Sequence, residues 1–175
     1  CHPMIWTRPE LRVLFVCTAN VCRSPLAQAL LRHRLQVAGL AARVQVRSAG
    51  TQTMQSGRRP DPGVEQIAAE AGISLARISS RKLTKRMIKG TDHVLVMEQA
   101  HLKDVSRLWN DDDYSDACPD NVQLLGCYLP ADVSGMGSPD IPDPYFGDLP
   151  GFFHVYDLID SAVAGFMAQV IEKGR

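Results

Sequence analysis

The sequence alternates short apolar runs with longer stretches of helical periodicity. The apolar runs lie at residues 11–16, 44–47, 94–96 and 122–125, and the main helical patterns lie at 25–38, 61–72, 99–109 and 151–172. Strands that read as continuous apolar runs are buried on both faces, and helices between them connect parallel neighbours. The alternation therefore predicts an α/β fold: a single domain with a central four-stranded parallel sheet and helices on both faces.

The helical stretches carry their own start and stop signals. Ser24 is predicted to cap the first helix and Pro25 to be its first residue, with Gly39 as the stop. A second helix is predicted between Asp61 and Gly72. The 175 residues suit one domain, which we assign to residues 11–175. Residues 1–10 are expected to be an N-terminal extension of the kind that a cloning vector contributes.

Charge and cysteine usage exclude several classes of function. The 19 basic and 19 acidic side chains balance, so no nucleic-acid partner is expected. No apolar run approaches the roughly 18–20 residues that cross a bilayer, so no membrane insertion is expected. The five cysteines are odd in number and scattered, which favours free thiols in the cytoplasm, and no pattern predicts a metal site. A basic cluster is interpreted as a solvated face: Arg81, Lys82, Lys85 and Arg86.

A polar loop, C-T-A-N-V-C-R-S, joins the first predicted strand to the first helix. Such a loop directs several backbone N–H groups and a helix N-terminus at one point, which is typical of phosphate binding. Arg23 can add a bidentate contact, and Cys17 in that field has the character of a thiolate nucleophile. Ligands of parallel sheets bind beyond the carboxyl ends of the strands. The sequence thus predicts a phosphate-binding loop after the first strand.

The segment V-C-T-A-N-V-C-R-S-P resembles the signature V-C-x-G-N-x-C-R-S-P of the low-molecular-weight protein tyrosine phosphatases, bacterial type. The resemblance continues through S-A-G-T at residues 48–51, the helix start at 61–62, V-L-V-M at 94–97 and D-P-Y at 143–145, and covers about residues 11–172. It implies hydrolysis of phosphotyrosine through a cysteinyl phosphate, without a cofactor. It also implies a phosphotyrosine protein as partner, with a bacterial tyrosine kinase of exopolysaccharide control as one case, and leaves the oligomeric state open.

The resemblance assigns roles to individual residues. Cys17 is the nucleophile, Arg23 holds the phosphate, and Asp143 is the general acid and base. From the residues alone, Asp143 competes with Asp140 and Asp148, and Ser24 could be only a helix cap. The remaining loop and supporting positions are Thr18, Ala19, Asn20, Val21, Cys22, Ser24, which stabilises the thiolate, and Ser48, which braces the loop. The expected walls of the substrate pocket are Met54, Tyr145 and Phe146.

Three loop positions refine these expectations. Ala19 replaces the family's glycine, which would cost about 1 kcal/mol if the position needs a positive φ. Val21 is apolar and favours an aromatic ring over a guanidinium. The resemblance also implies that Cys22 can form a reversible disulfide with Cys17, which would protect the nucleophile from over-oxidation.

Three rival functions stay open. Arsenate reduction on this fold uses a cysteine relay after the third strand, but residues 97–101 contain no cysteine. Protein-arginine phosphatase activity is disfavoured by Val21. A non-catalytic phosphotyrosine-binding module is disfavoured because every catalytic residue type is present. We therefore predict a protein-tyrosine phosphatase.

Overall fold

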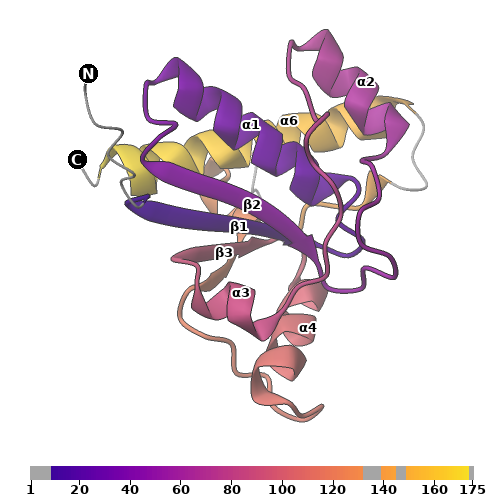
Figure 1. Cartoon of the computed structure of the whole chain (residues 1–175), viewed down its shortest axis with the longest axis vertical. Helices are drawn as coiled ribbons and strands as arrows, with labels where there is room; N and C mark the ends of the chain where they lie inside the picture. The colour runs from indigo at the N-terminus through magenta and orange to yellow at the C-terminus, as the bar shows by residue number, and fades with distance from the viewer. Residues whose placement is uncertain (1–8, 132–138, 145–148, 174–175) are drawn as a thin grey trace, which may run out of the picture.

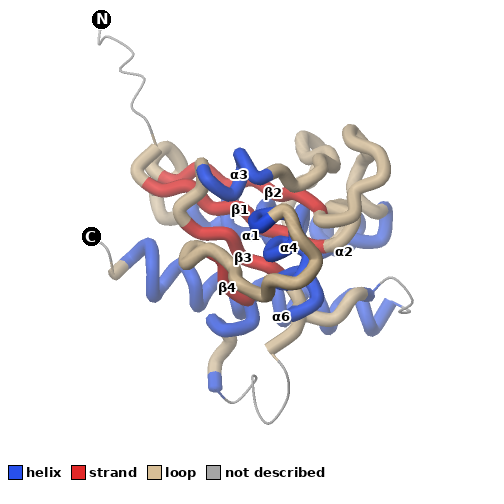
Figure 2. The backbone as a smooth tube through the Cα atoms, turned by 90° about the horizontal axis from the view of Figure 1, so that it is seen from below, coloured by secondary structure: helices blue, strands red, loops and turns tan. Residues whose placement is uncertain are grey.

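The computed structural model describes residues 9–131, 139–144 and 149–173, and within them the chain forms one parallel sheet (Figures 1 and 2). Its strands are β1 (Leu11–Cys17), β2 (Val44–Gly50), β3 (His93–Val96) and β4 (Val122–Leu124), in the order β2-β1-β3-β4. All three pairings are parallel. The predicted four-stranded parallel sheet is confirmed.

The register of the sheet brings the strand ends that matter to one edge. Cys17 at the end of β1 lies opposite Gly50 at the end of β2, and Val16 lies opposite Val96 at the end of β3. The residues that follow these three strands must therefore meet at the carboxyl edge. That edge is where parallel sheets bind their ligands.

Helices cover both faces of the sheet (Figure 1). One face is covered by α1 (Arg23–Val37) and α6 (Leu149–Phe166), with α2 (Pro62–Glu70) against α6, and the other carries α3 (Lys85–Lys89) and α4 (Gln99–Asn110). After β4 the chain makes a 3₁₀ turn, η1 (Leu125–Tyr128), and after α6 it continues as a π-helix, η3 (Met167–Glu172). No helix among the described residues has the length and apolar character to cross a membrane.

The alternation of side chains along β1 divides the core into two clusters. Val13 and Phe15 face the cluster built with α1 and α6, while Leu14 and Val16 face the cluster built with α3 and α4. Each of these four side chains is at most 3% exposed. Burial on both faces explains why the strand reads as an unbroken apolar run.

Helix boundaries differ from the prediction at the loop between β1 and α1. The prediction that Ser24 caps α1 is wrong, because the helix begins at Arg23 and its N-cap residue is Cys22. Ser24 thus lies inside the first turn, where its hydroxyl is available for other contacts. The predicted stops are confirmed, since Gly39 and Gly72 follow α1 and α2 with φ values of 72° and 77°. These left-handed conformations favour glycine.

Candidate active site

The loop between β1 and α1 is shaped by Asn20, which has a left-handed backbone with φ of 58°. Asparagine tolerates this conformation better than most residues. Its side chain is held at both ends: Nδ2 donates to Ser24 Oγ at 2.7 Å, and Oδ1 accepts from the Arg81 backbone N–H at 2.9 Å. Ala19 does not have a positive φ, so the strain expected there is absent. Its carbonyl accepts a hydrogen bond from Thr53 Oγ1 at 3.2 Å.

The segment after β2 braces the loop from outside. The backbone N–H of Thr51 donates to the Cys17 carbonyl at 2.9 Å, and that of Gln52 donates to the Thr18 carbonyl at 2.8 Å. Gly50 permits this close approach, because a β-carbon there would lie 2.6 Å from the Thr18 oxygen. The S-A-G-T motif therefore has a structural reason for its glycine.

The nucleophile candidate, Cys17, is 3% exposed and lies with its Sγ 2.9 Å from Ser24 Oγ. Because Asn20 donates to the same oxygen, the Ser24 hydroxyl proton can point either at the sulfur or at the Ala49 carbonyl oxygen, which lies 3.4 Å away. Burial raises the pKa of the Cys22 thiol, and the charges of Cys17 and Asp143 add to the increase. Cys22 therefore stays a neutral thiol at physiological pH.

Arg23 is 2% exposed, and its guanidinium is held by groups from two distant segments. Nη1 forms an ion pair with Glu98, the N-cap residue of α4 after β3, and also donates to the Ile141 carbonyl at 2.8 Å. Nη2 lies 3.7 Å from Asp143 Oδ2. The structure thus brings together Arg23 and Asp143, as the sequence predicts.

The competing carboxylates are placed differently. The Asp143 side chain is 44% exposed, so it lies at the surface of the site beside Arg23. Asp140 Oδ1 accepts from the Gln99 backbone N–H at 2.9 Å, at the start of α4. Asp148 lies outside the described residues. Of the two candidates that the structure describes, the one beside the buried arginine is Asp143.

Two residues of the site, Glu98 and His101, were not predicted from the sequence. His101 is 2% exposed, and its Nδ1 accepts from the Glu98 backbone N–H at 3.0 Å. Its other nitrogen, Nε2, must then carry the proton, and it lies 2.9 Å from Thr18 Oγ1 in the catalytic loop. Burial lowers the pKa of His101, and the charge of Arg23 lowers it further, which agrees with a neutral ring whose Nδ1 accepts a hydrogen bond. The signal available in the sequence was the place of Glu98 and His101 in the segment that follows the third apolar run.

The remaining predicted residues lie at the edges of the site. Ser48 Oγ lies 2.5 Å from the side-chain amide of Gln28 on α1, so its contact is with the helix that follows the loop. Val21 is buried, while Met54 is 97% exposed. Tyr145 and Phe146 lie outside the described residues. Within the described part of the chain, no group of three or more His, Cys, Asp or Glu side chains is placed to hold a metal ion.

Comparison with known proteins identifies the family to which this site belongs. Residues 12–175 match the family model of the low molecular weight phosphotyrosine protein phosphatases. The chain belongs to this family. It is an enzyme of the protein-tyrosine-phosphatase class, built on the family's cysteine-based phosphatase fold.

Relatives of the phosphatase support the assignment in sequence and in structure. A low molecular weight protein-tyrosine-phosphatase of Streptomyces coelicolor is 38% identical over 162 residues, which cover 93% of this chain and 94% of the relative. The tyrosine phosphatase Wzb of Escherichia coli K30, solved with sulphate, superposes with a TM-score of 0.74 at 27% identity and covers 91% of this chain and 97% of its own. The YwlE arginine phosphatase of Bacillus subtilis, solved as a mutant with a phosphorylated active-site serine, gives 0.77 at 26% identity, covering 93% and 97%.

Proposed function

We propose that this phosphatase hydrolyses phosphotyrosine in proteins through a cysteinyl phosphate on Cys17. The observation that carries the proposal is the convergence of three groups at one end of the sheet. The Cys17 sulfur lies 2.9 Å from a hydroxyl that can stabilise its thiolate, and the buried Arg23 guanidinium lies 3.7 Å from the Asp143 carboxylate. A nucleophile, a phosphate clamp and an acid are the parts that this reaction needs.

In the first step, the Cys17 thiolate attacks phosphorus, the sulfur–phosphorus bond forms and the bond to the tyrosine oxygen breaks. Asp143, in its protonated form, donates its proton to the leaving phenolate. The loop N–H groups and Arg23 hold the phosphoryl oxygens as their charge shifts. The sulphate reported in Wzb is an anion of the same tetrahedral shape.

In the second step, the Asp143 carboxylate accepts a proton from water, and the water oxygen attacks phosphorus. The sulfur–phosphorus bond breaks, orthophosphate leaves, and the Cys17 thiolate is restored. The phosphorylated active-site serine of YwlE supports a covalent phosphoryl intermediate at the nucleophile position. In this account Cys22, which stays protonated, takes no part in the transfer.

Glu98 and His101 act in this mechanism as positioning residues. Glu98 holds the buried Arg23 guanidinium at the edge of the loop, so a phosphate dianion must compete with a carboxylate for it. His101 orients the Thr18 hydroxyl by donating from its Nε2–H to Thr18 Oγ1. Both residues follow β3, so the third strand sets the position of a loop that follows the first.

We infer that the cellular setting is the cytoplasm, where the phosphatase opposes a bacterial tyrosine kinase in exopolysaccharide control. Free cysteines support a reducing compartment, because Cys17, Cys22, Cys118 and Cys127 form no disulfide with one another. Under oxidation, the nearby Cys22 thiol would trap Cys17 as a reversible disulfide. Higher phosphotyrosine on such a kinase after deletion of the gene would support this setting, and unchanged phosphotyrosine would contradict it.

Hydrolysis of para-nitrophenyl phosphate with EDTA at pH 5–7 tests the mechanism. We expect activity in the wild type, none in Cys17→Ser, and normal activity in Cys127→Ser, a control at an exposed cysteine. Asp143→Asn should slow turnover by about 10²–10⁴-fold, most with poor leaving groups. Asp140→Asn, the matched control, should stay within about threefold of the wild type. Full activity of Cys17→Ser would contradict the proposal.

A second set of substrates tests the specificity. The likeness to YwlE, an arginine phosphatase, keeps phosphoarginine as the alternative substrate. We expect phosphotyrosine peptides to be preferred, because the buried Val21 contributes an apolar surface to the loop. A preference for phosphoarginine peptides would instead assign protein-arginine phosphatase activity. Arsenate would be tested with thioredoxin if no phosphoester is hydrolysed.

A further inference from the structure

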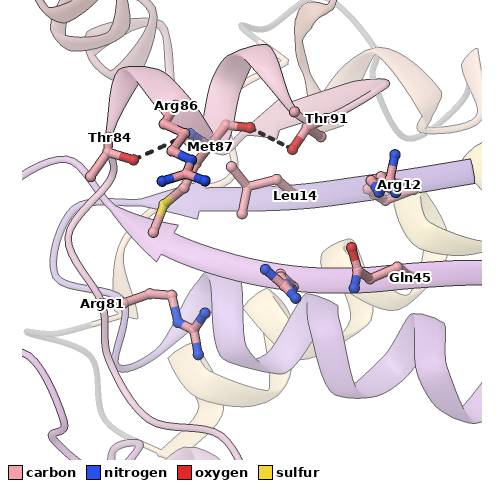
Figure 3. A pocket seen from close by; sticks show the side chains of 11 residues that line it. Arg12, Leu14, Gln45, Arg81, Thr84, Arg86, Met87 and Thr91 are labelled. Carbon is pink, nitrogen blue, oxygen red and sulfur yellow. Dashed lines mark hydrogen bonds between the residues drawn. The ribbon is translucent and has the colours of Figure 1, made fainter.

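A groove rich in arginine crosses the face of the sheet between β2 and α3 (Figure 3). Its volume is about 510 Å³, in the range of small-molecule sites. Four arginines line it: Arg12 of β1, Arg47 of β2, Arg81 before α3 and Arg86 within α3. Two of them belong to the sequence cluster interpreted as a solvated face. The fold adds two others from strands far away in the chain.

The positive charge of this groove is not neutralised locally. Within the described residues, none of these four arginines forms a salt bridge. The neighbouring carboxylate of Asp92 accepts the backbone N–H of Arg12 at 2.7 Å. A chain with zero formal net charge therefore concentrates positive charge on one face.

A second hollow, of about 130 Å³, lies at the edge of β2 on the α1 side of the sheet, opposite α3, and shares two of the groove's arginines, Arg47 and Arg81. It adds Arg32 and Arg77, so six guanidinium groups border the two hollows. Burial lowers the pKa of Arg32, and the charges of Arg47 and Arg81 lower it further. Arg47 and Arg81 border both hollows, so an anion in the groove would relieve the repulsion that they feel from Arg32.

Neutral donors complete the groove. Thr84 Oγ1 accepts from the Met87 backbone N–H at 3.2 Å, so the Thr84 hydroxyl proton remains available to a ligand. Figure 3 shows this contact and the labelled side chain of Gln45, whose amide can also donate. Guanidinium forks, a hydroxyl and an amide make a surface of donors that matches phosphate oxygens.

The spread of the charges selects the type of anion. One phosphate can engage only one or two guanidinium groups, and each exposed ion pair contributes little in salt. Linked phosphates can engage several of these arginines at once. The volume is suited to a small molecule, since a stable protein partner needs a far larger buried surface.

We propose that this groove binds a small anion with several linked phosphate groups, at a site separate from the catalytic loop. The two candidate ligands, inorganic tripolyphosphate and a nucleoside triphosphate, share a triphosphate chain. The proposal does not depend on the catalytic mechanism. The site nevertheless adjoins the loop, because the backbone N–H of Arg81 donates to Asn20 Oδ1 at 2.9 Å.

Backbone amide NMR titrations of the full chain, without divalent metals, test the proposal. Inorganic tripolyphosphate and ATP are the two probes, and orthophosphate is the control anion. We expect tripolyphosphate to shift amides in residues 45–47 and 84–91, and orthophosphate at the same concentration to shift only residues 17–24. Equal or tighter binding of ATP would assign the nucleoside form, and binding of tripolyphosphate alone would assign the inorganic form.

Variants that remove positive charge show which arginines contribute to tripolyphosphate binding. The double variant Arg47→Gln/Arg86→Gln should weaken tripolyphosphate binding at the groove by about tenfold. The double variant Arg59→Gln/Arg107→Gln removes the same charge from exposed positions outside the groove and should bind like the wild type. The proposal would be overturned if tripolyphosphate and ATP shifted only the amide resonances of residues 17–24, or if orthophosphate shifted the resonances of the groove as much as tripolyphosphate does. It would also be overturned if both double variants weakened tripolyphosphate binding to the same extent.

Discussion

His101 offers a test in which two substitutions separate the two hydrogen bonds of one buried ring. Its Nδ1 accepts from the Glu98 backbone at the start of α4, and its Nε2 lies 2.9 Å from the Thr18 hydroxyl. Asparagine places its side-chain oxygen near the position of Nδ1, and glutamine places its amide nitrogen near that of Nε2. His101→Asn therefore keeps the helix contact, and His101→Gln keeps the loop contact.

The expected magnitudes follow from the value of one hydrogen bond, about 1 kcal/mol net. If the contact with Thr18 positions the loop for reaction, His101→Asn should lower kcat/KM by about fivefold, the equivalent of about 1 kcal/mol. His101→Gln should stay within about twofold of the wild type. The free energy of unfolding should fall by about 1 kcal/mol in both variants, because each loses one hydrogen bond: the Glu98 N–H loses its acceptor in His101→Gln, and the Thr18 hydroxyl loses its donor in His101→Asn.

Steady-state kinetics with para-nitrophenyl phosphate and urea denaturation measure the two quantities on the same preparations. A purely structural histidine would make activity follow stability, so that the two variants, which lose similar stability, would also lose similar activity. Equal kcat/KM in the two variants would therefore refute the inference that His101 positions Thr18.

Three further predictions follow from the structure. The free energy of unfolding should fall as the pH drops below about 6.5, because burial lowers the pKa of His93 and His101 in the folded state and the unfolded chain therefore binds protons on these residues more tightly. Urea denaturation at pH 5 and at pH 7.5 measures this difference. Gly50→Ala should lower kcat by at least about tenfold, measured in the same assay, because its β-carbon would lie 2.6 Å from a carbonyl oxygen of the loop. Glu98→Gln should lower the inhibition constant of orthophosphate about threefold by removing the carboxylate that competes for Arg23, and a higher constant would contradict this.

The sequence alone determined the strand–helix order and the place of the loop between β1 and α1, because both depend on local patterns. Apolar runs are made of consecutive residues, and helix stop signals such as Gly39 and Gly72 are single positions next to the helix that they end. The segment from Cys17 to Ser24 likewise carries its chemistry within eight neighbouring positions. Even there, tertiary contacts overrode local preference at Ser24, whose hydroxyl serves Cys17 rather than the helix end.

Only the tertiary structure decided which distant groups meet that loop. Glu98 and His101 have no local signature beyond their place after the third apolar run, and they reach Arg23 and Thr18 because β3 pairs in parallel beside β1 and ends at the same edge. The arginine groove has the same origin, since β1, β2 and α3 each contribute to it. Parallel pairing joins segments far apart in the chain, so the resulting charge clusters depend on packing and register, which no local pattern encodes.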